Sequence, residues 1–217
     1  MTLILTALCR NGISICSDKR SKRIFDSGKI EYSDNLNKTY SFDDVNVAIC
    51  NHGVNEIQGK SWKVFCSDYD KSNRWEKKNL FQIFNDFKEF LTEDVEGQLK
   101  DNFKHGRISF TGFIVSGKTN MDTKFKINEI AWKFDSGGIH SVIKRHWGLV
   151  KTGVAEKYLE NYINVHSDLD TIDYWKRMNT FQAEEELKKL FIIAVEEGKR
   201  LDKEKKISDK CDVVSIT

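Results

Sequence analysis

The residue whose chemistry stands out is Thr2, which directly follows Met1. Removal of the initiator would leave Thr2 at the N-terminus, with a hydroxyl group and a free α-amine on one residue. An α-amine has an ordinary pKa of about 7.7–8.0, so much of it can act as a base near neutral pH. A neighbouring base of this kind activates a hydroxyl nucleophile. The first two residues therefore suggest a hydroxyl nucleophile that is activated by its own amine.

The segment that follows predicts a β-hairpin. Residues 3–8 form an apolar, strand-like run, and residues 13–16 form a second one. Asn11-Gly12 between them is a strong signal for a two-residue turn. Such a turn returns the chain beside its own beginning, so we expect Asp18 and Arg20 to lie near the start of the chain.

The rest of the chain alternates blocks of strands with pairs of helices. Apolar residues recur at helical spacing in four segments and alternate with period two in the others. The predicted helices cover residues 54–68, 79–91 (continuing or restarting at 92 through 103), 154–163 and 180–203. The predicted strands cover residues 3–8, 13–16, 38–50 (two strands around a turn at Asp43-Asp44), 107–116, 123–134, 139–144 and 211–216, and residues 21–37 read as a polar loop with a short strand near Ile30.

Antiparallel strand blocks need cover on a face, and two helix pairs can supply two outer layers. The sequence therefore predicts an α+β fold, a four-layer αββα sandwich of two antiparallel sheets flanked by helix pairs. No internal repeat, low-complexity segment or linker divides the chain, so we expect a single domain over residues 1–217.

Composition excludes several classes of function. The net charge is +2, from 35 basic and 33 acidic residues, so neither a nucleic acid nor an anionic membrane is implied as a partner. No stretch approaches the roughly 20 apolar residues of a membrane span. Five cysteines without a CxxC pair suggest neither zinc nor a disulfide framework, and reduced thiols favour a cytoplasmic location. The histidines show no metal-ligand spacing and no Gly-rich phosphate loop is present, so we expect no metal and no cofactor.

The opening MTLILTAL followed by NGISICSDKRS resembles the start of the β-type subunits of the proteasome. In that family a terminal Thr opens a strand, a Gly-containing turn follows, and the second strand ends in Ala-Asp-x-Arg. Ser17-Asp18-Lys19-Arg20 holds that place here, at the same distance from the Thr. The order of elements is also similar to that of the wider N-terminal-nucleophile (Ntn) hydrolases, over essentially all 217 residues, although identity outside the motifs is low.

The resemblance implies roles for four residues. Thr2 would be the nucleophile, and Lys38 would place a positive charge beside it, which lowers the pKa of the hydroxyl and the amine. Asp18 would orient Lys38 and balance its charge. Gly53, which the family places at the opening of the first helix, would point its N–H at the developing oxyanion, an effect worth about 3 kcal/mol.

Other positions depart from the family pattern. Where the family has Gly-Ser-Gly beside the terminal amine, this chain has Lys151-Thr152-Gly153, so Thr152 keeps the hydroxyl. Asp202 could supply the family's second Asp, while Ser208 lies too far along the chain to match the Ser that follows it without an insertion. Lys22 replaces a small Thr that pairs with the substrate backbone. Asn51 and Asn55 would form a pocket floor suited to a polar or small side chain.

Three functions follow from these observations. The first is a threonine peptidase acting on peptides or unfolded polypeptide, in a homo-oligomer such as a ring. The second is an inert subunit that keeps Met1 and serves as a scaffold, which Lys151 and Lys22 favour. The third is an amidase that uses the same nucleophile on a small molecule. Only the second does without Thr2 at the terminus.

Overall fold

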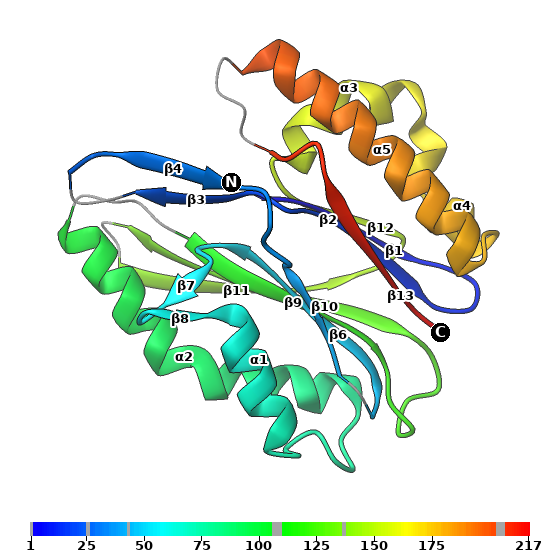
Figure 1. The fold of residues 1–217 in the computed structure, drawn as a ribbon. Helices are drawn as coiled ribbons and strands as arrows, with labels where there is room; N and C mark the ends of the chain where they lie inside the picture. Colours follow the sequence, from blue (N-terminus) through cyan, green and yellow to red (C-terminus); the bar gives the residue numbers. More distant parts are fainter. Residues whose placement is uncertain (1, 25–26, 43, 106–109, 136–137, 203–206) are drawn as a thin grey trace. The chain divides into compact units, whose positions relative to one another are not determined.

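We analysed a computed structural model that describes residues 2–24, 27–42, 44–105, 110–135, 138–202 and 207–217. The chain divides into two compact units, one formed by residues 1–39 and 147–217 and the other by residues 40–146. Each unit contains an antiparallel sheet with helices packed on it (Figure 1). The chain is thus a mixed α+β protein, whereas a single domain over residues 1–217 stays a prediction.

The first unit is built on a four-stranded sheet in the order β12-β1-β2-β13. The predicted hairpin is confirmed, because β1 and β2 pair antiparallel with Leu8 opposite Ile13. The expected two-residue turn at Asn11-Gly12 was wrong, because four residues, 9–12, separate the strands and neither Asn11 nor Gly12 has the positive φ angle that such a turn requires. The main strands are β1 (Leu3–Leu8), β2 (Ile13–Asp18), β12 (Leu149–Gly153) and β13 (Cys211–Ile216), and a separate hairpin comprises β3 (Ser21–Ile24) and β4 (Ile30–Ser33). The helices are α3 (Ala155–Val165), a 3-10 turn (Ser167–Asp170), α4 (Ile172–Lys176) and α5 (Thr180–Leu201).

The helices of this unit cover one face of its sheet (Figure 1). Alternate residues of β1 point into the resulting core, as the period of a strand requires. Asn179 caps α5 through a reciprocal pair of hydrogen bonds with Gln182, which explains where the helix begins. The core combines strand and helix residues, among them Leu3, Leu5, Ala7, Tyr158, Trp175, Leu187, Leu190, Phe191 and Ala194.

The second unit is built on a five-stranded sheet in the order β11-β10-β9-β6-β5. The apolar residues of the helix predicted over residues 79–91 face its core, and Phe84, Phe87 and Leu91 are fully buried. The strands are β5 (Thr39–Ser41), β6 (Asn46–Gly53), β9 (Phe110–Lys118), β10 (Lys126–Asp135) and β11 (Gly138–His146), with a small hairpin of β7 (Glu56–Ile57) and β8 (Lys60–Ser61). The helices are α1 (Trp62–Lys71) and α2 (Leu80–Lys104), which runs without a break at residue 92.

The helix predicted from residue 54 was wrong at its start. It begins only at Trp62, because residues 56–61 form the hairpin β7–β8. Gln58 and Gly59 both have positive φ angles, +50° and +75°, which suit a tight hairpin turn and cannot occur within a right-handed helix.

Other differences lie at element ends. The 3-10 turn and α4 lie between α3 and α5, where the sequence predicts no helix. Residues 149–153 form a strand that the sequence does not predict either. Met1, Asp43, the expected strand residues 107–109 and Lys203 lie outside the described residues. In the described part of the chain, no helix is both long and apolar enough to cross a membrane.

Candidate active site

Thr2 lies directly before β1 and is almost fully buried, with 4% of its surface exposed. Its carbonyl oxygen accepts a hydrogen bond of 2.9 Å from the N–H of Val154, which continues the ladder between β1 and β12. Gly153 in that ladder has a φ of +71°, and a Cβ atom there would lie 1.8 Å from the Thr2 carbonyl oxygen. A glycine at this position is therefore needed for the chain to hold Thr2 where it lies.

Asp18 ends β2 and reaches back to the start of β1. Its Oδ1 accepts a hydrogen bond of 2.8 Å from the N–H of Leu3, and its Oδ2 accepts one of 3.0 Å from the N–H of Arg20. The hairpin register explains the first contact. Because Ile4 lies opposite Ser17 in an antiparallel pair, Leu3, which precedes Ile4, lies near Asp18, which follows Ser17. The β1–β2 hairpin thus fixes a carboxylate beside the peptide that joins Thr2 to Leu3.

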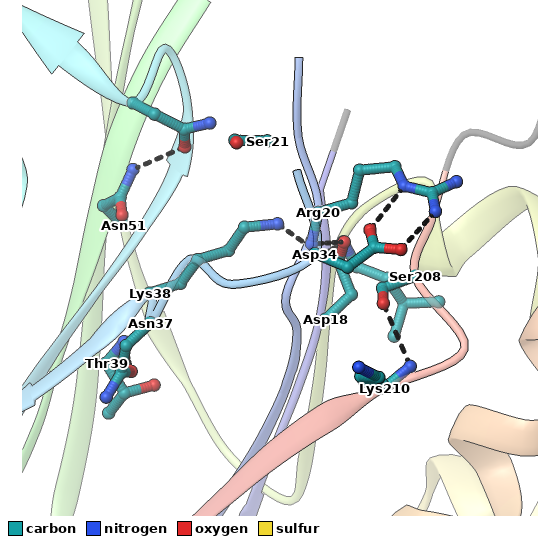
Figure 2. Close-up of polar contacts among 12 residues, drawn as sticks. Asp18, Arg20, Ser21, Asp34, Asn37, Lys38, Thr39, Asn51, Ser208 and Lys210 are labelled. Carbon is teal, nitrogen blue, oxygen red and sulfur yellow. Dashed lines mark hydrogen bonds and ion pairs between the residues drawn. The ribbon is translucent and has the colours of Figure 1, made fainter. Parts of the chain in front are cut away.

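Lys38 directly precedes β5 and pairs with the same carboxylate (Figure 2). Its Nζ lies 2.5 Å from Asp18 Oδ1, the oxygen that also accepts the Leu3 N–H. Both side chains are completely buried. A buried ammonium is costly unless it is paired and hydrogen-bonded, so the carboxylate is what allows the lysine to lie there. Asp18 Oδ1 thus contacts both the Lys38 ammonium and the peptide N–H that directly follows Thr2.

Two hydroxyl groups near this peptide have no hydrogen-bond partner among the described residues. They are Thr2 Oγ1 and Thr152 Oγ1, and both are buried. Thr152 lies opposite Ile4 on the neighbouring strand β12. A buried polar group without a partner costs about 1–3 kcal/mol, and such exceptions often mark a functional position. The Thr2 hydroxyl is therefore one such exception among the described residues.

The two candidate residues near the end of α5 differ in their surroundings. The Asp202 carboxylate contacts the Tyr158 hydroxyl and lies 3.2 Å from the Lys157 ammonium, and both of these residues belong to α3. Ser208 is fully buried, and its Oγ accepts a hydrogen bond of 3.0 Å from the Lys210 N–H. The Lys19 N–H in turn donates to the Lys210 carbonyl, at 3.2 Å. The segment of Ser208 thus returns to the end of β2, and Figure 2 shows it in the same close-up as Asp18.

The substrate contact expected of Lys22 falls on an exposed hairpin. Lys22 is part of β3, opposite Tyr32 of β4, and its Nζ lies 5.9 Å from the centre of that ring. All four residues of β4 are exposed. The side chain therefore stacks on the hairpin itself, while its main chain belongs to the two-stranded ladder.

Gly53, Asn51 and Asn55 belong to the second unit. Gly53 ends β6 and does not open a helix, which corrects the expectation taken from the resemblance. Its φ is +86°, and a Cβ atom there would lie 2.2 Å from the Phe110 carbonyl oxygen. Asn51 is buried, and its Nδ2 lies 3.4 Å from Asn55 Oδ1, so the structure brings these two amides together.

Two histidines flank one buried carboxylate of the second unit. Glu129 Oε2 lies 2.5 Å from His146 Nε2, and Glu129 Oε1 lies 3.1 Å from His52 Nε2. Burial alone would raise the pKa of Glu129, but these contacts outweigh it and lower the pKa to about 2. Among the described residues, no group of three or more His, Cys, Asp or Glu side chains is arranged to hold a metal ion.

Comparisons with known proteins point to one class of fold. Neither a protein-family model nor a curated protein matches the sequence. Among solved structures, Anbu (ancestral beta-subunit) from Yersinia bercovieri has a TM-score of 0.60 and 10% identity, over 99% of this chain and 81% of that one. A Gly-1 mutant of Anbu from Hyphomicrobium sp. strain MC1 has a TM-score of 0.56 and 12% identity, over 100% and 81%.

At such low identity the comparison shows the fold alone, which is the proteasome-like fold of Ntn hydrolases. Both structures described above are of Anbu.

Proposed function

We propose that the chain is a threonine peptidase of the proteasome β type, which hydrolyses peptide bonds with Thr2 after removal of Met1. The observation that carries this proposal is the shared oxygen of Asp18, which accepts both the Lys38 ammonium and the Leu3 N–H beside an unpartnered Thr2 hydroxyl. A nucleophile, a positive charge and an orienting carboxylate are the parts that activation of a terminal threonine needs.

In the proposed reaction the Thr2 α-amine accepts the proton of the Thr2 hydroxyl as its oxygen attacks the scissile carbonyl. The bond to the leaving amine breaks, that amine takes the proton, and an ester on Thr2 remains. Water, deprotonated by the same α-amine, hydrolyses the ester and restores the hydroxyl. The Lys38 ammonium favours the neutral amine and the developing alkoxide because it lowers both pKa values, and Asp18 keeps the ammonium in place.

The remaining candidate residues take supporting roles in this proposal. The Gly53 N–H would stabilise the oxyanion, and Thr152 and Asp202 would hold the terminal amine. The Lys22 main chain, Asn51 and Asn55 would contact the substrate. We also propose the four-layer αββα arrangement, because each unit has an antiparallel sheet that helices cover.

The proposed setting follows from the same class of protein. Anbu carries the description of a beta-subunit, so we propose a homo-oligomer, with a ring as one form, acting on peptides or unfolded polypeptide without a cofactor. A cytoplasmic location is proposed from the cysteine content, because five cysteines without a CxxC pair suggest no disulfide framework. Light scattering of the purified protein tests the oligomeric state.

A scaffold role is the alternative that one observation favours. Lys151, which replaces a family glycine next to Thr152 in the sequence, forms an ion pair of 2.6 Å with Asp170. Such a subunit would keep Met1. An amidase for a small molecule is the other alternative, and turnover of a small amide compared with a peptide separates it from a peptidase.

The test begins with the intact mass of the protein. Loss of one methionine residue is expected, followed by covalent addition of a peptide β-lactone, which acylates a hydroxyl nucleophile, at Thr2. Thr2→Ala should abolish the addition. Thr6→Ala is the matched control, because Thr6 is a buried threonine of β1, the strand that begins after Thr2, and its hydroxyl also lacks a partner among the described residues; it should leave the addition unchanged. Retention of Met1 in active oligomer, or equal labelling of Thr2→Ala, would overturn the proposal.

A further inference from the structure

The loop between Arg20 and Lys38 is held by several contacts that have no role in the proposed reaction. It contains the hairpin β3–β4, in which Ser21 lies opposite Ser33. The five residues that follow, 34–38, belong to no helix or strand. We call residues 34–38 the return segment, because they bring the chain back along the end of β2 to Lys38.

Three consecutive residues at the end of β2 hold the return segment at alternate positions. Arg20 binds Asp34, the Lys19 carbonyl accepts a hydrogen bond of 3.0 Å from the Leu36 N–H, and Asp18 binds Lys38. The pairing continues the antiparallel direction of the hairpin, since Ser21 is already opposite Ser33. The order of contacts therefore fixes both the position and the direction of the segment that ends at Lys38.

The contact farthest from Lys38 is the strongest by geometry (Figure 2). The Arg20 guanidinium donates through Nε to Asp34 Oδ1 at 2.7 Å and through a terminal nitrogen to Asp34 Oδ2 at 2.6 Å. Two parallel bonds of this kind fix orientation as well as distance. Only 8% of the Arg20 side chain is exposed, and its guanidinium lies 5.5 Å from the centre of the Tyr32 ring. Because 31% of the Asp34 side chain is exposed, the pair is only partly shielded from the solvent screening that weakens surface ion pairs.

We propose that Asp34 and Arg20 are positioning residues, which place the Lys38 ammonium through the return segment. This inference rests on the proposed function, because it assigns how that site is held. A lysine ammonium sits on a flexible four-carbon stem, so its position depends on where the backbone carries it. Without the Asp34 anchor, the hydrogen bond from the Leu36 N–H to the Lys19 carbonyl is the contact described above that still holds the return segment before Lys38.

The consequence for the reaction is a change in the pKa of the Thr2 amine. A positive charge held beside that amine lowers its pKa, and a displaced charge lets it rise toward the ordinary value of about 7.7–8.0. A misplacement of about 1 Å can cost roughly 100-fold in rate. Release of the return segment is therefore expected to change the pH profile as well as the rate.

The test compares Asp34→Ala with Glu31→Ala in the oligomeric, processed protein. Glu31 is a matched control, because its carboxylate lies on the same hairpin and pairs with the exposed Lys29, away from the return segment. The first readout is the rate at which acetic anhydride modifies Lys38, followed by peptide mass spectrometry. The second is the pH dependence of Thr2 acylation by the peptide β-lactone, and the third is kcat and KM for a peptide substrate.

For Asp34→Ala we expect modification of Lys38 to be at least about tenfold faster, and acylation at neutral pH to be about 10- to 100-fold slower. The lower limb of its pH profile should move to higher pH, with KM nearly unchanged. Glu31→Ala should match the wild type in all three. Asp34→Asn, which keeps one acceptor for the guanidinium, should be intermediate, and it carries the test if Asp34→Ala does not fold.

The proposal is overturned if the folded variant leaves both Lys38 modification and the pH limb at wild-type values, whatever happens to the rate. The modification of Lys38 does not depend on catalysis. If wild-type Thr2 is never acylated, the proposed function fails, and the Lys38 rates still decide whether Asp34 positions the lysine.

Discussion

Replacement of Lys38 by methionine tests the central feature of the candidate site. The change keeps most of the side-chain volume and removes the ammonium from a pair in which neither partner is exposed. Removal of one partner from a buried ion pair costs about 3–5 kcal/mol, because an uncompensated charge stays behind. After Lys38→Met, Asp18 still accepts hydrogen bonds from two backbone N–H groups, those of Leu3 and Arg20. We therefore expect a loss of about 3 kcal/mol, at the lower end of this range.

The partner substitution should cost more. Asp18→Leu leaves a buried ammonium and deprives the same two backbone N–H groups of their acceptor, so we expect a loss of about 5 kcal/mol. The double variant should be more stable than the sum of the two losses predicts, because no uncompensated charge remains. An interaction free energy of about 2–3 kcal/mol is expected for residues in such direct contact.

Urea unfolding measures these free energies by linear extrapolation. Two probes are needed, one for each compact unit, since a single transition cannot be assumed for the two units. Lys126→Met is the control, because Lys126 also pairs with a buried aspartate at 2.5 Å but has 25% of its side chain exposed. It should cost no more than about 1 kcal/mol. A loss below about 1 kcal/mol for Lys38→Met, or Asp18→Leu no worse than Lys38→Met, would refute this reasoning.

Three further predictions concern other parts of the chain. Gly153→Ala should cost about 1–3 kcal/mol by urea unfolding and slow acylation of Thr2, because the new Cβ atom meets the Thr2 carbonyl oxygen at a positive φ. The pKa of Glu129 in the folded protein is about 2, against an ordinary 4.5. Its contribution to stability is therefore complete above about pH 4.5 and is lost as the pH falls toward 2. In Glu129→Gln, the urea midpoint should change less between these two pH values than in the wild type. Cys211 should be the first thiol that iodoacetamide alkylates near neutral pH, because the hydrogen bond between its sulfur and that of Cys16 lowers the pKa of Cys211 to about 7, whereas the pKa of Cys16 is raised by the same bond and by burial. Peptide mapping that finds Cys16 modified first would contradict the last prediction.

Local signals explain which parts of the fold the sequence could predict. An Asn-Gly pair between two apolar runs indicates a hairpin from local residues alone, and strand pairing then places Asp18 near the start of β1, although the turn itself spans residues 9–12. Amphipathic periodicity predicts α2 and α5 for the same reason, as the pattern is repeated over many turns. The predicted helix start at residue 54 failed because Gln58 adopts a positive φ that its residue type does not announce.

The site was less predictable because its parts come from distant segments. Lys38 was assigned only through the resemblance, since nothing local indicates that a lysine before a short strand is buried against Asp18. Asp34 was missed altogether, because its loop reads as polar and solvent-exposed. The one available signal was the hairpin register, which continues from Ser21 and Ser33 to Arg20 and Asp34 once the hairpin is known.

The buried pair also bears on the choice between an enzyme and a scaffold. A buried ion pair is weak evidence for stability, since apolar residues of similar size often do as well or better. A scaffold needs only a packed strand end at this place, and leucine-sized side chains would supply it. The chain instead buries the charged pair of Asp18 and Lys38 and leaves the Thr2 hydroxyl without a partner among the described residues, and each of these features costs folding energy. A catalytic role for Thr2 would explain why the chain keeps both of these unfavourable features, so we favour a hydrolase over a scaffold.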